Sequence, residues 1–247
     1  MILSNKTLLI TGGTSALGSK LVSQALAQGA RVFFTYFQAS DKAKNLIQKG
    51  AEGFRLDLAD VSAMDQLIKD FKSKTDKLDV LIHNAAAVRD HTLGNMTEEE
   101  WDYVMKVNLK APYYLTKKLL SFFLKKNKTA ESTSPKKIFM ITSRVGLMGG
   151  FGISNYAASK AGLIALTKSL SQELGSRNVL VNAVNPGFMK SSMTEHLPEE
   201  VKETNRLASP IEKFSDPEEV ARFILYLCSD QMTQVTGQVF HFESRKI

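Results

Sequence analysis

The feature that most constrains the fold is a glycine-rich turn between an apolar strand and an amphipathic helix near the start of the chain. Residues 7–11 predict a buried strand, residues 16–28 a helix, and residues 31–36 a second strand. The turn runs from Thr11 to Gly18 and reads Thr-Gly-Gly-Thr-Ser-Ala-Leu-Gly. This order of elements is that of a βαβ unit, whose two strands lie parallel.

The same alternation of strands and helices continues to the end of the chain. Thr97 and Glu100 form a capping box that marks the start of a long helix. Further strands are expected at 53–56, 78–82, 137–142, 179–184 and about 238–242, and a helix at about 62–74. Strand segments that are apolar on both faces, separated by helices, indicate a parallel sheet covered on both sides. We therefore expect one domain over residues 1–247, an α/β doubly wound parallel sheet (Rossmann fold) of about seven strands flanked by helices.

Composition and charge exclude several classes of protein. The chain is 43% hydrophobic and 23% charged, as in soluble globular proteins, and no apolar stretch reaches the roughly 18 residues that span a bilayer. No signal peptide is recognisable, so we expect a cytoplasmic protein without a membrane partner. The net charge of +7 comes from scattered residues that fit solvated helix ends, and we expect no nucleic-acid partner. The lone Cys228 lies in an apolar run and is interpreted as a buried hydrophobe.

The glycine-rich turn is the expected place for a dinucleotide. Glycines let a pyrophosphate approach the backbone N–H groups at the N-terminus of the following helix. The second strand ends at Tyr36 and Gln38 without the acid that would bind the ribose 2′-hydroxyl of NAD, and Lys42 and Lys44 follow. NADP(H) is therefore favoured, with NAD(H) as the alternative. The two lysines are equally typical of a solvated helix face.

A second group of residues carries the expected chemistry. Tyr156 and Lys160 are four residues apart, which places them on one face of a helix. A nearby ammonium favours the phenolate, so Lys160 is expected to lower the tyrosine pKa from its reference value of about 10 toward the working pH. Ser143, at the end of an expected strand, could hold a substrate oxygen beside the tyrosine. The hydride would come from a nicotinamide, because no side chain can supply one.

Six segments in this order resemble the short-chain dehydrogenase/reductase family. They are Thr11-Gly12 to Gly18, Asn84-Ala85-Ala86, Asn108, Ser143, Tyr156-x3-Lys160 and Asn185-Pro186-Gly187. The resemblance implies an NAD(P)-dependent enzyme in which Tyr156 is the acid/base, Ser143 binds the substrate oxygen, Lys160 binds the nicotinamide ribose and Asn108 holds a water in a proton relay. It also implies a set of further cofactor-binding residues: Gly12, Gly13, Thr14, Ser15, Leu17, Tyr36, Asp57, Leu58, Asn84, Ala85, Ala86, Pro186, Gly187 and Met189. We expect no metal site.

Within the family, the chain is most similar to the 3-oxoacyl-acyl-carrier-protein reductases, notably at 145–149, 156–163, 181–188 and 193–200. That similarity implies NADPH-dependent reduction of a carrier-bound 3-oxoacyl thioester, as in fatty acid biosynthesis, by a homotetramer. The chain departs from the subgroup at several positions. Ala16 replaces the family's middle glycine, and the tail over residues 242–247 lacks the usual Asp-Gly-Gly. Ser15 stands where NADP-using reductases commonly carry an arginine, and Gln172 replaces an arginine used in docking the carrier. Lys125, Lys126 and Lys128 are therefore a candidate replacement for the docking charge.

Two other functions stay open. The same chemistry could act on another small-molecule ketone or alcohol, such as a polyketide, a cyclic ketone or a sugar. A catalytically silent NADP-binding module that works through protein or RNA contacts is the third reading, and the intact set of Tyr156, Lys160, Ser143 and Asn108 argues against it. Substrate choice is expected to depend on residues 146–153 and on a helical lid within 189–209. Residues 129–136 are expected to form a polar surface loop.

Overall fold

The computed structural model describes residues 1–124, 134–191, 193–195 and 197–242. Within these residues, seven strands form one parallel sheet in the order β3-β2-β1-β4-β5-β6-β7. The strands are β1 (Thr7–Ile10), β2 (Arg31–Tyr36), β3 (Glu52–Arg55), β4 (Val80–His83), β5 (Lys136–Ile141), β6 (Val179–Asn185) and β7 (Val239–His241). The order of strands reverses between β1 and β4, which is where doubly wound sheets bind their ligands. The predicted fold class is confirmed.

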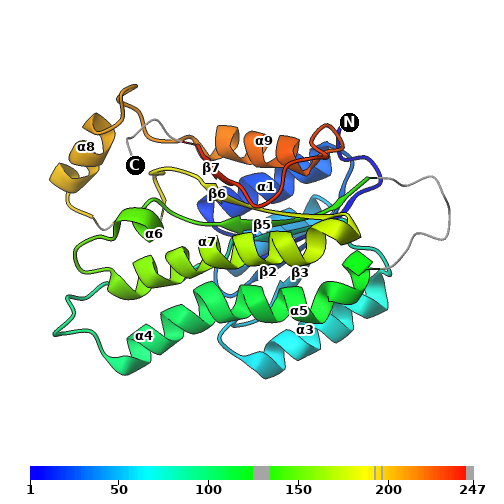
Figure 1. Cartoon of the computed structure of the whole chain (residues 1–247), viewed down its shortest axis with the longest axis horizontal. Coiled ribbons are helices and arrows are strands. Elements are labelled where there is room, and N and C mark those ends of the chain that lie inside the picture. The colour runs from blue at the N-terminus through cyan, green and yellow to red at the C-terminus, as the bar shows by residue number, and fades with distance from the viewer. Residues whose placement is uncertain (125–133, 192, 196, 243–247) are drawn as a thin grey trace.

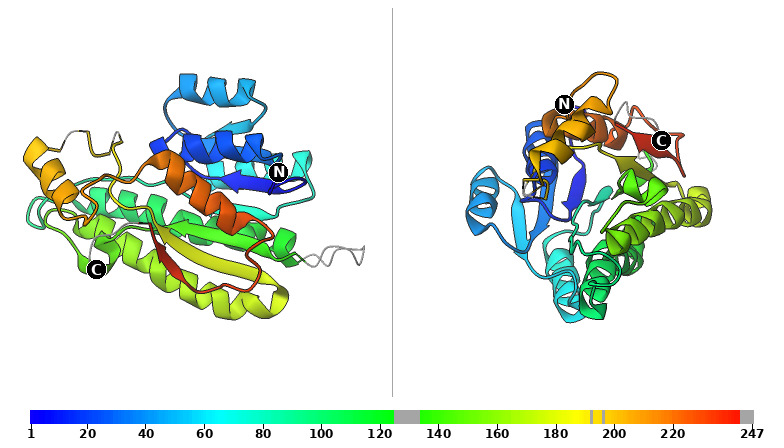
Figure 2. Two further views of the ribbon diagram at one scale, coloured as in Figure 1. Left: turned by 90° about the horizontal axis from the view of Figure 1, so that it is seen from above. Right: turned by 90° about the vertical axis from the view of Figure 1, so that its left-hand side faces the viewer.

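Helices cover both faces of the sheet (Figures 1 and 2). One face carries α1 (Ala16–Ala27), α2 (Ser40–Gln48) and α9 (Pro217–Cys228), and the other carries α3 (Val61–Lys74), α5 (Ala111–Leu124) and α7 (Ser154–Leu174). The remaining helices are α4 (Glu98–Met105), the π-helical η1 (Lys106–Lys110), α6 (Val145–Met148), the 3-10 helix η2 (Gly175–Arg177) and α8 (Glu199–Leu207).

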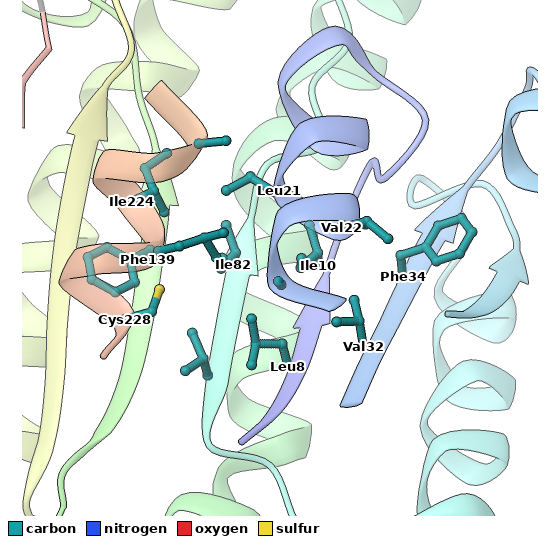
Figure 3. Packing of buried hydrophobic residues seen from close by; sticks show 14 of the residues in the cluster. Leu8, Ile10, Leu21, Val22, Val32, Phe34, Ile82, Phe139, Ile224 and Cys228 are labelled. Atoms are coloured by element: carbon teal, nitrogen blue, oxygen red, sulfur yellow. The ribbon is translucent and has the colours of Figure 1, made fainter. Parts of the chain in front are cut away.

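The core consists of two apolar layers, one on each face of the sheet. Successive residues of a strand point to opposite faces, so Leu8 and Ile10 pack in the layer with α1 and α9, and Leu9 packs in the other. Figure 3 shows the first layer, where Leu21 and Val22 of α1 meet the strands. This alternation explains why the central strands β1 and β4 are apolar and buried along nearly their whole length, as the sequence indicated.

The boundaries of two elements can be compared with those expected from the sequence. The capping box at Thr97 is confirmed, since its side chain accepts from the N–H of Glu100 and the Glu100 carboxylate accepts in return. The helix that follows is not continuous, because η1 interrupts it. Lys136 was expected in a surface loop, and it instead begins β5, since its N–H bonds to the carbonyl of Asn178 beside β6.

The segment expected as a lid contains α8, which confirms its helical character. Residues 129–133 of the expected polar loop and the lysine cluster at 125–128 lie outside the described residues. In the described part of the chain, no helix is both long and apolar enough to cross a membrane.

Candidate active site

The carboxyl ends of the parallel strands open into one cleft of about 520 Å³. The carboxyl ends of the strands point toward the end of the molecule that also carries α6 and α8 (Figure 1). The cleft brings together most of the residues that the sequence singled out: Gly12, Thr14, Ser15, Leu17, Tyr36, Asp57, Leu58, Asn84, Ala85, Ala86, Tyr156, Lys160, Pro186 and Met189. The cleft is not lined by Gly13, Asn108, Ser143 or Gly187.

The glycine-rich turn is packed too tightly for side chains. Gly12 has a φ of +68°, and a Cβ there would lie 2.8 Å from the Cα of Ala85. A Cβ on Gly18 would lie 2.1 Å from the carbonyl oxygen of Gly12. Gly13 faces the sheet, where a Cβ would lie 2.6 Å from the Phe34 ring. The turn has no room for these side chains, and because Gly12 also lines the cleft, its backbone can cradle a pyrophosphate.

Two polar side chains fix this turn in place. The Asn84 amide donates to the carbonyl oxygens of Gly12 (2.9 Å) and Thr11 (3.0 Å), which ties β4 to the turn. The Ser15 hydroxyl caps α1 by accepting from the N–H of Gly18 at 3.0 Å. The N-terminus of α1 thus faces the cleft with its positive dipole end and open N–H groups.

The far end of the cleft, beside β2, carries one lysine that could meet an anionic group. Lys42 lines the cleft together with Tyr36 and Gln38. Lys44 does not line it, and its ammonium instead pairs with the Asp41 carboxylate at 3.3 Å. The structure therefore separates two lysines that the sequence could not distinguish.

Tyr156, Lys160 and Ser143 meet at the opposite end. Burial raises the pKa of Tyr156 to about 12, against a hydrogen bond with Ser143 that lowers it, and Asp90 raises it further. Lys160 is 2% exposed, donates to the carbonyl of Ile141 at 2.7 Å, and burial lowers its pKa to about 8. The sequence led us to expect a lowered tyrosine pKa. In the free cleft, burial instead raises that pKa, so the phenol carries its proton at neutral pH.

Asn108 lies within the π-helical segment η1, and such segments often occur at functional sites. Its side chain is completely buried and forms hydrogen bonds with one residue, Ala87, of the segment that follows β4. The amide accepts from the N–H of Ala87 at 2.7 Å, and donates to the Ala87 carbonyl (3.0 Å) and to the Ser159 hydroxyl (3.1 Å). Both amide hydrogens are engaged with protein atoms. The relay water therefore stays a prediction, and the observed contacts are structural ties.

Two residues that line the cleft, and a third buried beside Tyr156, were not expected from the sequence. The Thr142 hydroxyl is buried without a hydrogen-bond partner beside Ser143, and a hydroxyl-rich ligand in the cleft would satisfy it. Tyr103 also lines the cleft, and its pKa is raised by burial and by Asp57. Asn155 is fully buried and contacts the backbone of Tyr156. In the sequence, Thr142 and Asn155 are marked only by their position next to Ser143 and Tyr156. No sequence pattern marks Tyr103.

The residues present fit a nicotinamide dinucleotide. The glycine cradle suits a pyrophosphate, the orphaned Thr142 hydroxyl and the Lys160 ammonium suit ribose hydroxyls, and the apolar Met189 and Pro186 suit a ring. Within the described residues, no group of three or more His, Cys, Asp or Glu side chains could hold a metal ion.

Comparison with known proteins identifies relatives over the whole chain. A family model described as enoyl-(acyl carrier protein) reductase matches residues 12–244. The 3-oxoacyl-[acyl-carrier-protein] reductase FabG of Thermotoga maritima is 38% identical over 97% of this chain and 96% of that protein. The reductase of the same name from Staphylococcus epidermidis is 35% identical over 96% of this chain and 97% of that protein.

Solved structures agree with these relatives. An RhlG/NADP active-site complex from Pseudomonas aeruginosa superposes with a TM-score of 0.88, at 26% identity, over 98% of this chain and 96% of that one. A short-chain dehydrogenase/reductase from Serratia marcescens also gives a TM-score of 0.88, at 25% identity, over 99% and 98% of the two chains. With the cleft, the Tyr156 and Lys160 pair and these relatives in agreement, the chain belongs to the short-chain dehydrogenase/reductase family, an oxidoreductase family that uses a nicotinamide cofactor.

Proposed function

We propose that this chain catalyses the NADPH-dependent reduction of a 3-oxoacyl thioester, carried on an acyl carrier protein, to the 3-hydroxyacyl thioester. The observation that carries the proposal is the meeting of Tyr156, Ser143 and Lys160 at one end of a dinucleotide-type cleft, in a chain 38% identical to a 3-oxoacyl-[acyl-carrier-protein] reductase. Residues 1–247 would act as one domain in a cytoplasmic homotetramer.

When bound in the cleft, a nicotinamide cofactor would supply the hydride that reduces the ketone carbon, C3, of the substrate. The Ser143 hydroxyl donates to the C3 ketone oxygen and holds it beside Tyr156. The neutral Tyr156 phenol, whose pKa burial raises to about 12, gives that oxygen its proton as charge develops on it. Lys160 binds the ribose hydroxyls and stabilises the phenolate that is left. The ketone is reduced to an alcohol, and a proton from solvent restores the phenol.

For the cofactor, the proposal of NADP(H) over NAD(H) rests on charge at the β2 end of the cleft. This end of the cleft is lined by Tyr36, Phe37 and Gln38, none of which offers a carboxylate to accept from a ribose 2′-hydroxyl. Lys42 lines the same part of the cleft. An ammonium there favours a 2′-phosphate. Ser15 adds no positive charge, so the preference is modest.

The test is NADPH oxidation, followed by absorbance, with a panel of candidate substrates. We expect the highest kcat/KM with a carrier-bound 3-oxoacyl thioester, a lower value with acetoacetyl-CoA, and the lowest with simple ketones. An enoyl thioester is included because the matching family model bears that description. Its reduction places a proton on carbon rather than on a ketone oxygen. Faster turnover of the enoyl thioester, or of a cyclic ketone or sugar, would overturn the substrate assignment.

Two further measurements test the oligomeric state and the alternative of a catalytically silent module. Sedimentation of the purified protein tests the homotetramer, and a monomer would contradict it. A chain that binds NADPH but reduces none of the substrates would instead favour a catalytically silent binding module.

A further inference from the structure

The backbone N–H and the backbone carbonyl of Tyr156 both form hydrogen bonds with side chains. The Tyr156 N–H, in the first turn of α7, donates to the Asn155 side-chain oxygen at 2.7 Å. The Tyr156 carbonyl accepts from the Ser159 hydroxyl at 2.7 Å. The first N–H groups of a helix have no partner within the helix, so the Asn155 oxygen fills a position that would otherwise be vacant.

The other end of the Asn155 side chain reaches a distant segment. Its amide nitrogen donates to the carbonyl of Arg89 at 2.9 Å. Arg89 lies in the segment that joins β4 to α4 and borders the cleft through Ala85, Ala86 and Ala87. Asn155 has an exposed fraction of 0%, so water does not compete for either bond. One buried amide therefore joins this segment to the residue that carries the reacting phenol.

A second path runs in parallel with the first. Asn108 holds both backbone groups of Ala87 and also donates to the Ser159 hydroxyl, which in turn donates to the Tyr156 carbonyl. The segment after β4 is thus tied to Tyr156 at Ala87 through Asn108 and Ser159, and at Arg89 through Asn155. Because buried side-chain networks are rigid when every partner is satisfied, these ties restrict movement of α7 relative to the segment.

We propose that Asn155 is a positioning residue for the reduction: by bridging the Arg89 carbonyl and the Tyr156 N–H, it fixes where the Tyr156 hydroxyl lies relative to the β4–α4 segment. The inference rests on the proposed acid role of Tyr156. Misplacing a reacting group by about 1 Å can cost on the order of 10²-fold in rate. Loss of the bridge therefore lowers kcat, while the cofactor contacts of the glycine-rich turn remain.

The decisive variant is Asn155→Asp, which has nearly the same shape. As a carboxylate it can still accept from the Tyr156 N–H but faces the Arg89 carbonyl without a hydrogen to donate. As a neutral acid its O–H restores that donor. Burial raises the pKa of the introduced carboxyl. The change between its carboxylate and its neutral acid therefore falls within the pH range in which the enzyme can be assayed. We expect kcat about 10- to 100-fold below the native value at high pH, recovering as the pH is lowered, with the Kd for NADPH nearly unchanged.

Asn182 offers a matched control. It is 4% exposed, and its amide likewise bridges two backbone groups, donating to the Val235 carbonyl at 2.7 Å and accepting from the Gln238 N–H at 3.0 Å. It does not line the cleft. Asn182→Asp introduces the same buried carboxyl into the same type of bridge, and we expect it to reduce thermal stability without a recovery of kcat at low pH.

A third variant, Asn155→Leu, removes both bonds without adding charge, and it should lower kcat at every pH. Native kcat in Asn155→Leu would overturn the proposal. It would also be overturned if Asn155→Asp and Asn182→Asp gave the same pH dependence of kcat, because the effect would then follow from a loss of folded protein. A separate variant tests whether Tyr156 is the acid. If it is not, Tyr156→Phe keeps the native turnover, whether or not the Asn155 variants lower kcat.

Discussion

The Lys160 ammonium nitrogen lies 5.5 Å from the centre of the Tyr156 ring, one helical turn along α7. At the same time it donates to the Ile141 carbonyl at the end of β5, the strand that also leads to Ser143. The lysine thus connects the helix that carries the phenol with the strand that leads to the substrate-binding hydroxyl. Its burial makes its charge depend on pH within the range where enzymes are assayed, because its pKa falls to about 8.

Replacing Tyr156 with Phe removes the proposed acid but keeps the ring. We expect turnover to fall roughly 10²- to 10⁴-fold, the range for loss of a positioned general acid, with cofactor binding retained. Turnover follows from NADPH absorbance and binding from fluorescence titration. The acid role is wrong if Tyr156→Phe turns over like the native enzyme.

Lys160→Ala should weaken both cofactor binding and catalysis. Its ammonium is proposed to serve the ribose and the phenolate alike, so the Kd for NADPH should rise while kcat falls. Both quantities can be measured on one preparation, with circular dichroism to check folding. A change in neither would contradict the dual role.

The pH dependence of reduction should reflect Lys160. The Tyr156 phenol keeps its proton to a pKa of about 12, whereas Lys160 loses its charge near a pKa of about 8. We therefore expect kcat/KM for ketone reduction to decline as the pH rises through about 8. Lys137, whose pKa burial also lowers to about 8, does not line the cleft, so Lys137→Met should keep this decline. A flat profile between about pH 7 and 9.5 would show that Lys160 keeps its proton once cofactor is bound.

Cofactor preference should depend on one lysine of two. Because Lys42 lines the cleft and Lys44 pairs with Asp41, Lys42→Gln should remove the preference for NADPH and Lys44→Gln should retain it. An exposed ammonium contributes at most about 1 kcal/mol, so the preference should be about five-fold. Fluorescence titration of both cofactors with both variants measures it. An equal loss in the two variants would place the 2′-phosphate elsewhere.

Much of the fold and part of the site could be predicted from the sequence, because local patterns determine them. The central strands β1 and β4 are buried on both faces, and Gly12 and Gly18 of the first turn leave no room for a side chain. The π-helical η1 could not be predicted. Its sequence continues the helical pattern from Thr97, and the altered register depends on where Asn108 meets Ala87 in the folded chain.

The electrostatics of the site were also beyond sequence reasoning. Spacing placed Lys160 beside Tyr156 correctly, but the direction of the tyrosine pKa depends on how completely the assembled cleft excludes water. The bridge from Asn155 to Arg89 joins residues 66 positions apart, and no local pattern indicates such a contact.

The last prediction concerns the buried Lys137 at the start of β5. It is 2% exposed, and its ammonium donates to the carbonyls of Leu227, Ser229 and Met232, at and beyond the C-terminus of α9. Lys137→Met leaves these carbonyls without that donor, and we expect a loss of about 2 kcal/mol at pH 7, or roughly 4 to 8 °C in Tm.

The sign of the pH effect follows from the lowered pKa of Lys137. Between about pH 8 and the ordinary lysine value of 10.5, the unfolded chain binds more protons at this site than the folded chain, so the free energy of unfolding rises with pH. Lys160 adds a contribution of the same sign. The Met variant keeps only the Lys160 contribution, so the stability gap between native and variant should widen from pH 7 to pH 9.5 in urea unfolding. A gap that does not widen would mean that the pKa of Lys137 is not lowered in the fold, and that its carbonyl contacts offset the effect of its burial.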